Sequence, residues 1–306
     1  MTGRVCVIGS FMMDLVAAAP RRPLSGETLI GTGFAMHLGG KGMNQAVAAA
    51  RSGAQVAMIG RLGNDDFGAR FRSALDAEGI DASSVRTDPV EGTGVGLPVV
   101  EPDGTNSIIV IPRANHRLEV GDVEAASSVI AQADALLLQF ELPLETAVAA
   151  ARIAAQAGVI VIVNPAPALR PPDGLSGFVD YLVPNEGEAE RLTGVDTDTD
   201  DGRAAAVALL AGWSARGVVV TVGERGAVVA HGDVVEQVEA LPVHVVDTVG
   251  AGDAFSGALA ARLAAGDGLL DAVGYARVAA ALSCTRAGAA GAMPWRQEVE
   301  AAMAGV

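Results

Sequence analysis

The chain has few cysteines, few aromatic residues and no long apolar run, and each shortage excludes a class of protein. Cys6 and Cys284 are the only cysteines among 306 residues. Both lie in apolar segments, one strand-like and one helix-like, so we expect two buried free thiols in a reducing compartment, with a disulfide as the alternative. No uninterrupted apolar stretch reaches the roughly 18 residues that a membrane span needs. The apolar run near the N-terminus is too short for a secretion signal and predicts a first buried strand, so we expect a cytoplasmic protein.

Basic residues are also scarce. Lys and Arg total 21 against 36 Asp and Glu, which gives a formal net charge of −15. Without a basic run or a basic patch with interleaved aromatics, we expect no binding to nucleic acid or to an anionic membrane. Half of the residues are apolar. That content and length predict a substantial core in one large α/β domain, with or without a small extension.

Strand-like and helix-like segments alternate along most of the chain. The expected strands are Val56–Ile59, Ala135–Phe140, Val159–Val163, Tyr181–Pro184 and Val218–Val222, and the expected helices are Phe67–Glu78, Leu144–Ala157, Glu186–Leu192 and Gly202–Trp213. This alternation favours a parallel sheet covered by helices on both faces. Residues 15–37 and about 92–112 break it, since they are extended and punctuated by turns. We expect them to form antiparallel strands outside the main sheet, although simple long hairpins would give the same pattern.

A glycine turn that carries a carboxylate lies near the C-terminus. The β-branched run Val243–Val246 predicts a strand, and the Ala-rich run Ala254–Ala265 predicts a helix. Between them, Gly250 and Gly252 allow a sharp bend that exposes backbone N–H groups at the helix start, where an anion is stabilised. Asp253 falls in the first helical turn and could accept a proton from a hydroxyl that attacks a bound phosphoryl group. It could equally serve only as a helix-terminal acid.

A second glycine cluster, residues 38–45, opens another expected helix. That helix runs through Ala46–Arg51 and ends at Gly53, a typical residue after a helix C-terminus. The cluster is no Walker A loop, because Gly42 follows Lys41 where Ser or Thr would bind magnesium. It is either a tight structural turn or a ligand loop with Lys41 and Asn44 at its lip, suited to a polyhydroxylated molecule.

Together these two motifs resemble the ribokinase branch of the phosphofructokinase-B (PfkB) sugar kinase family. The resemblance extends to further segments in matching order: Gly9-Ser10 with Asp14, Gly60–Gly68, Glu141, Asn164–Pro167, Asn185-Glu186 with Glu188, Thr221–Gly223 with Gly226, and Pro294-Trp295. It implies a three-layer α/β/α ribokinase-like fold with a mostly parallel central sheet. Residues 1–306 would form one kinase domain, in which segments of about 15–37 and 92–112 build a small β-sheet lid.

The resemblance also implies an activity. ATP would transfer its γ-phosphoryl group to the 5-hydroxyl of a pentose, most simply D-ribose. Asp253 would accept the hydroxyl proton while the N–H groups of Gly250, Ala251 and Gly252 stabilise the transferring group. Members of the family often pair through the lid, so a homodimer is expected.

Binding residues follow from the same resemblance, position by position. The sugar would contact Met12, Asp14, Gly40, Lys41, Asn44, Glu141 and Asp253. The nucleotide would contact Asn185, Thr221, Gly223, Glu224, Gly226, Gly252 and Arg277. A monovalent cation, K⁺, would be ringed by oxygens of Asp247, Val249, Ser283, Arg286, Gly288 and Ala292. Mg²⁺ would bind mainly through water near Asn185 and Glu188.

One position departs from the family pattern. Met12 stands two residues before Asp14, where an asparagine is usual. A thioether cannot replace the amide's hydrogen bonds, so the pocket could favour a sugar with one hydroxyl fewer, such as 2-deoxyribose. Two wider alternatives stay open: another sugar or nucleoside kinase of the same family, although 4% aromatic residues leave little to stack on a base, and a sugar sensor without catalysis.

Overall fold

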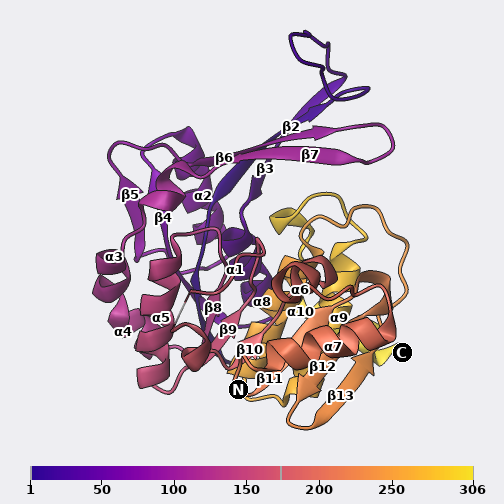
Figure 1. The fold of residues 1–306 in the computed structure, drawn as a ribbon. Coiled ribbons are helices and arrows are strands. Elements are labelled where there is room, and N and C mark those ends of the chain that lie inside the picture. Colours follow the sequence, from indigo (N-terminus) through magenta and orange to yellow (C-terminus); the bar gives the residue numbers. More distant parts are fainter. Residues whose placement is uncertain (1, 173, 306) are drawn as a thin grey trace.

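The computed structural model describes residues 2–172 and 174–305, which form two sheets with helices around the larger one (Figure 1). The larger sheet has nine strands in the order β13-β12-β11-β10-β9-β8-β1-β4-β5. Their bounds are β1 Arg4–Ile8, β4 Gln55–Gly63, β5 Val85–Asp88, β8 Ala135–Leu138, β9 Ile160–Val163, β10 Tyr181–Leu182, β11 Gly217–Thr221, β12 Ala227–His231 and β13 Val234–Val238. All pairs from β5 to β11 are parallel, and β12 and β13 add an antiparallel edge.

Helices cover both faces of this sheet, as expected. The longer ones are α1 Lys41–Arg51, α2 Asp66–Ala77, α5 Leu144–Gln156, α6 Glu186–Thr193, α7 Asp200–Ala211, α8 Ala251–Ala264, α9 Leu269–Ser283 and α10 Arg296–Ala304; α3 Val120–Ala125 and α4 Ser127–Ala131 are short, as are the 3₁₀ turns η1 Arg113–Arg117, η2 Ser176–Phe178, η3 Gly223–Arg225 and η4 Ala290–Ala292. Each predicted helix is confirmed within a few residues at its ends.

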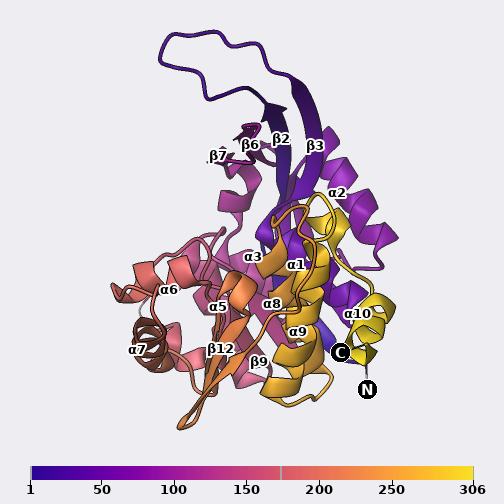
Figure 2. The same cartoon turned by 90° about the vertical axis from the view of Figure 1, so that its right-hand side faces the viewer.

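Two apolar cores lie on the two faces of the sheet. Strand β1 shows how the sequence divides its side chains, since Val5 and Val7 join the core beneath α1, α8 and α9, whereas Cys6 and Ile8 join the core beneath α5 and α7. Alternation along a strand sends successive side chains to opposite faces, and a strand covered on both sides is therefore apolar throughout. Figure 2 shows α1, α8 and α9 stacked together on one side of the molecule.

The small sheet stands beyond one end of the main sheet, in the order β3-β2-β6-β7 (Figure 1). It consists of β2 Met12–Ala18, β3 Gly33–Gly39, β6 Gly94–Val100 and β7 Asn106–Ile111. The expected separate sheet is confirmed, but one pairing differs: β2 and β6 are parallel. Both strands leave the main body in the same direction, since β2 follows β1 and β6 follows β5.

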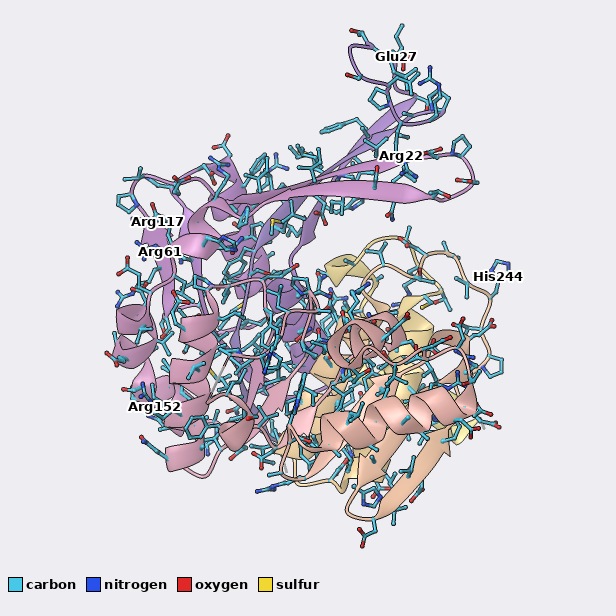
Figure 3. The ribbon with its side chains drawn as sticks, in the orientation of Figure 1. Arg22, Glu27, Arg61, Arg117, Arg152 and His244 are labelled. Atoms are coloured by element: carbon cyan, nitrogen blue, oxygen red, sulfur yellow. The ribbon has the colours of Figure 1, made fainter. Side chains whose placement is uncertain are left out.

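The far end of the small sheet is held together by ion pairs. Arg22 Nε lies 2.8 Å from Glu101 Oε1, which joins the loop after β2 to the β6–β7 hairpin. Arg21 pairs with Glu27 in the same loop at 2.5 Å. Figure 3 places Arg22 and Glu27 at this outer end, far from the main sheet. We call the four strands with this loop the lid.

Two local predictions are wrong. Val243–Val246 forms no strand, because the segment has no neighbouring strand to pair with and Val245 and Val246 are exposed. Its backbone is instead tied down by the N–H of Val246, which donates to the Cys284 carbonyl at 2.8 Å, and His244 projects outward from it (Figure 3). Cys284 is a free thiol but only half-buried, since it follows the last residue of α9; Cys6 is free and buried, as expected.

Candidate active site

The two glycine motifs meet because α1 and α8 pack at unusually short distance. Helix α1 follows Gly40, whose φ is +91°, and α8 follows Gly250, whose φ is +81°, a region that glycine adopts without strain. About two turns into α8, a Cβ on Gly257 would lie 2.4 Å from the carbonyl oxygen of Gln45. Only a glycine permits this approach, which brings the first turn of α8 against the first turn of α1.

Asp253 lies at this junction and is almost completely buried. Its Oδ2 accepts a hydrogen bond from Asn44 Nδ2 and its Oδ1 accepts one from Gln45 Nε2, each at 2.9 Å. The Lys41 ammonium lies 3.8 Å from Oδ1. The side chain therefore does not cap its own helix; it faces the loop that the second motif forms.

The sugar-side residues gather next to it. Glu141 Oε2 accepts hydrogen bonds from the backbone N–H of Lys41, at 3.0 Å, and from the hydroxyl of Ser10. Asn44 Oδ1 is buried and has no hydrogen-bond partner among the described residues. A buried acceptor without a partner costs free energy, so this oxygen is suited to receive a ligand hydroxyl.

The Asp14 side chain belongs to the lid and occupies space that is free because its neighbours are glycines. It lies opposite Gly96 across the β2–β6 pairing. A Cβ on Gly96 would lie 2.2 Å from Asp14 Oδ1, and one on Gly39 would lie 2.4 Å from Oδ2. The Asp14 carboxyl therefore packs directly against the backbone of Gly39 and Gly96, where a side chain would clash with it. Met12 lies on the same face, flanked by Gly39 and Gly94, and is only 4% exposed.

Burial shapes the charges in this cluster. It raises the pKa of Asp14 to about 6, with a smaller contribution from the negative charge of Glu141. It also raises the pKa of Glu188, against the hydrogen bond from the Asn185 N–H. For Lys41, burial acts to lower the pKa, but nearby carboxylates outweigh it and raise the pKa overall; they belong to Asp253, Glu141 and Glu188. The site is thus a cluster of carboxylates around one lysine.

The turn before α8 offers fewer free donors than expected. The N–H of Ala251 donates to the Thr248 carbonyl at 3.2 Å. Of the three predicted donors, Gly250 and Gly252 are therefore the two whose N–H groups have no hydrogen-bond partner within the described residues. A Cβ on Gly252 would meet no heavy atom within 4 Å, so this backbone faces open space. The turn keeps room for an anion, with two donors rather than three.

Most of the predicted nucleotide residues follow the carboxyl ends of β10 and β11, whereas Gly252 and Arg277 come from α8 and α9. Asn185 begins α6 and bridges to Thr221 at the end of β11. Gly223 and Gly226 flank Glu224 in η3 and both have positive φ. Arg277 comes from α9, where its Nη1 donates to the Glu239 carbonyl at 2.9 Å. Asn185 and Glu188 are occupied with each other in a reciprocal cap of α6.

The predicted cation residues converge from two loops. Asp247 Oδ1 accepts from the Val249 N–H at 3.0 Å and Oδ2 accepts from the Gly288 N–H at 2.9 Å. The carbonyls of Val249, Arg286 and Gly288 accept no backbone hydrogen bond in the described part of the chain. Ser283 ends α9 and Ala292 ends η4, beside these loops. Among the described residues no three His, Cys, Asp or Glu side chains form a metal-binding cluster.

Comparison with known proteins agrees with this geometry. The model of the pfkB family carbohydrate kinases matches residues 2–296. The chain belongs to this family. The kinase is 39% identical over 300 residues to the ribokinase of Bacillus subtilis, covering 97% of this chain and 98% of the relative. It is also 39% identical over 257 residues to the deoxyribokinase of Salmonella typhi, covering 84% of each.

A solved structure extends the likeness to the fold. Ribokinase of Arabidopsis thaliana, complexed with ribose and ATP, is 32% identical to this pfkB kinase, and the two align over 99% of each chain with a TM-score of 0.91. The ribokinase-like fold expected from the sequence is thereby confirmed. In the described residues no helix of this kinase has the length and apolar character that a membrane crossing requires.

Sequence reasoning passed over three residues of the kinase's site. Ser10 donates to Glu141, and Gln45 and Asn164 belong to the hydrogen bonds around Asp253. All three lie in segments that carry the family resemblance, but the resemblance assigned no role to them. The available signal for Gln45 was its place at the end of the glycine cluster that opens α1, since an amide that becomes buried there needs hydrogen-bond partners.

Proposed function

We propose that this pfkB kinase phosphorylates the 5-hydroxyl of a free pentose, D-ribose, with ATP as donor. The observation that carries the proposal is the position of Asp253: a buried carboxylate at the first turn of α8, 3.8 Å from the Lys41 ammonium and hydrogen-bonded to Asn44. The Bacillus subtilis relative is a ribokinase, and the Arabidopsis structure binds ribose and ATP.

The chemistry follows from this arrangement. The sugar hydroxyl oxygen attacks the γ-phosphorus while its proton passes to Asp253, the bond to the β-phosphate oxygen breaks, and ADP leaves. Lys41 and the N–H groups of Gly250 and Gly252 face the negative charge on the transferring group. Asp14 and Glu141 accept sugar hydroxyl protons and so orient the ring.

The test is a substrate panel with ATP, Mg²⁺ and K⁺. Ribose, 2-deoxyribose, arabinose, fructose, adenosine and pseudouridine are compared by kcat/KM at equal enzyme concentration. We expect transfer to ribose to exceed transfer to the nucleosides by at least tenfold. Preferred turnover of a nucleoside would replace the proposal with a nucleoside kinase, and no transfer to any acceptor would favour a sugar sensor.

2-Deoxyribose is the second candidate, because Met12 brings no hydrogen-bonding group to the face that holds Asp14. The methionine is buried between Gly39 and Gly94, and its Sδ would lie 3.0 Å from a Cβ on Gly94. The Salmonella relative is a deoxyribokinase. The ratio of kcat/KM for ribose to that for 2-deoxyribose decides between them. Met12→Asn should raise this ratio by about tenfold if the missing amide sets the preference.

Nucleotide and Mg²⁺ binding complete the proposal. ATP would lie along Asn185, Thr221, η3 and Arg277, with its γ-phosphate toward Gly252. Magnesium supplies charge neutralisation on phosphate oxygens. Since Asn185 and Glu188 already bond to each other, they would reach the metal mainly through water, which suits an ion that keeps several water ligands.

A potassium site fits the oxygens near Asp247. The free carbonyls of Val249, Arg286 and Gly288, with oxygens of Asp247, Ser283 and Ala292, are the donor type that such a cation prefers. A bound cation would hold the loop before α8 against the loop after α9. We expect K⁺ to raise activity severalfold over an equal concentration of tetramethylammonium.

Assembly and location belong to the same proposal. Strand pairing puts Met36 and Ile109 on the lid face opposite to Asp14, together with Phe34 and Ile111, and all four are exposed. We propose that two lids pair through this outer face to form a homodimer. A cytoplasmic location suits the two free thiols.

A further inference from the structure

A chain of buried amides ends on the proposed base. Gln139 Nε2 donates to Gln45 Oε1 at 2.6 Å, and Gln45 Nε2 donates both to Asp253 Oδ1 at 2.9 Å and to Asn164 Oδ1 at 3.0 Å. Asn164 Nδ2 in turn donates to the Val183 carbonyl at 2.8 Å. The three amides come from α1 and from the ends of β8 and β9. Gln45, Gln139 and Asn164 are 0%, 2% and 7% exposed, so water cannot readily substitute for these bonds.

The direction of this chain is fixed at its far end. A backbone carbonyl can only accept, so the Asn164 group that faces the Val183 carbonyl must be the NH₂. The Asn164 side-chain oxygen therefore faces Gln45, and Gln45 must donate to it with its own NH₂. The same NH₂ is then aimed at Asp253 Oδ1. A flipped Gln45 would set oxygen against oxygen at both contacts.

This arrangement fixes the orientation of the Asp253 carboxyl. Oδ1 accepts the hydrogen bond from Gln45 and Oδ2 accepts the one from Asn44, so neither oxygen can turn away without losing a bond. The other groups around Asp253 are Asn44 and Lys41 from α1, and Glu188 from α6, whose own pKa is raised mainly by burial and to a smaller extent by the charge of Asp253. Asn44 and Lys41 also face the expected sugar and phosphate, whereas the Gln45 amide is committed to the protein interior.

We infer that Gln45, oriented by Asn164, is a positioning residue that keeps the Asp253 carboxyl aimed at the acceptor hydroxyl. The inference rests on the proposed phosphoryl transfer, because it assigns the residue a part in that reaction. Gln45 does not touch the substrate; it acts through the base.

The first experiment compares Gln45→Met with Ala49→Gly. The methionine keeps the volume of the side chain but removes the donor. Ala49 is a buried residue one turn further along α1, and its change to glycine loosens the same helix without touching an amide. We expect Gln45→Met to lower kcat by about 10–100-fold, as for a misplaced base, with sugar KM within threefold.

Ala49→Gly should keep the kcat of the wild type even if it melts at lower temperature. Asn164→Leu frees the Gln45 amide to rotate and should reproduce part of the Gln45→Met effect in the same direction. If Gln45→Met keeps kcat within threefold of Ala49→Gly, the inference is wrong and Gln45 serves packing alone.

A second readout does not depend on turnover. In ¹H–¹⁵N spectra of the protein without substrate, the Gln45 NH₂ pair, assigned by its loss in Gln45→Met, should exchange slowly with solvent and shift in both Asp253→Ala and Asn164→Leu. If the Gln45 NH₂ protons exchange freely with solvent and shift in neither variant, the inferred orientation of the amide is wrong. A different outcome is that the wild-type protein transfers phosphate to no acceptor while this NH₂ pair behaves as expected. That outcome would reject the proposed reaction but not the orientation of the Gln45 amide.

Discussion

At the scale of single residues, the site depends on carboxylates held where solvent is scarce. Asp253 has both oxygens hydrogen-bonded to side-chain amides and is only 5% exposed. Asp14 rests against glycine backbones in the lid. In the proposed reaction the two have different tasks, since Asp253 would take a proton in the transition state and Asp14 would hold the ground-state sugar.

The first prediction concerns the base. Asp253→Asn keeps the size of the side chain but cannot accept a proton, so kcat should fall by about 10²–10⁴-fold. The KM of the sugar should stay within about threefold, because Asp14 and Glu141 still hold it. Steady-state kinetics with a coupled ADP assay measures both constants. Ordinary turnover by this variant would mean that another group accepts the proton.

The second prediction concerns Asp14 and pH. Burial raises the pKa of Asp14 from 3.8 in an open environment to about 6 in the folded protein. The folded state therefore binds this proton more tightly than the unfolded state, and the stabilising contribution is complete below about pH 4 and lost as the pH rises through 6. At pH 8 the protein carries a buried charge at a cost in stability.

Asp14→Asn removes that cost. Without sugar, the variant should melt at a higher temperature than the wild type at pH 8, and the difference should shrink as the pH falls from 7 to 4. Sugar affinity should decline at least tenfold at pH 8, as measured by calorimetry. A melting difference that does not depend on pH would show that Asp14 is not the group responsible.

At the scale of elements, close packing of α1 on α8 decides whether the base meets its partners. Gly257→Ala would place a methyl group 2.4 Å from the Gln45 carbonyl and 2.6 Å from Ala48 Cβ. Overpacking of this kind costs about 1–3 kcal/mol. The helices must separate, so kcat should fall at least tenfold together with the unfolding free energy.

Gly274→Ala in α9 is the matched control. Its added Cβ meets no heavy atom within 4 Å, so the change should stabilise the helix by about 0.5–1 kcal/mol and leave kcat unchanged. Chemical unfolding and initial rates compare the two variants. If Gly257→Ala is as active and as stable as Gly274→Ala, the two helices do not need this contact.

The elements also show where sequence reasoning succeeds. The helix boundaries and the core strands followed from periodicity and glycine punctuation, since burial on both faces leaves an unmistakable apolar run. Val243–Val246 has the same local pattern but no partner strand, and β propensity alone does not make a strand. Pairing is a property of the whole sheet that a single segment does not carry.

The residues of the candidate site also divide into those that the local sequence predicts and those that depend on the folded structure. Asp253 and Lys41 could be predicted because each stands in a glycine turn with a recognisable chemistry. The bonds among Gln45, Gln139 and Asn164 join residues 94 and 119 positions apart, and nothing in the local sequence shows that these amides meet. Similarly, the engaged N–H of Ala251 depends on the turn's detailed geometry.

At the scale of the whole molecule, the lid's outer face predicts the assembly. Phe34 and Ile109 are 70% and 65% exposed there, on the two edge strands β3 and β7, and apolar side chains gathered on one exposed face are a typical interaction surface. Phe34→Glu combined with Ile109→Lys should convert a dimer to monomers in sedimentation equilibrium. Leu209→Lys, at an exposed apolar site on α7, should leave the dimer intact. A wild-type protein that sediments as a monomer at all concentrations would refute the proposed homodimer.

The lid strand β2 has consequences for how this enzyme can evolve. Its odd and even positions lie on opposite faces of the lid, with Met12 and Asp14 on the face proposed to bind the sugar and Met13 and Leu15 on the other. Deleting one residue from the strand would exchange the two sets, turning an acid outward and presenting hydrocarbon to the ligand. Length changes are therefore forbidden in β2 but tolerable a few residues later, in the exposed irregular stretch 20–32. Natural variation in the length of the lid should therefore accumulate in residues 20–32, while the number of residues in β2 stays constant.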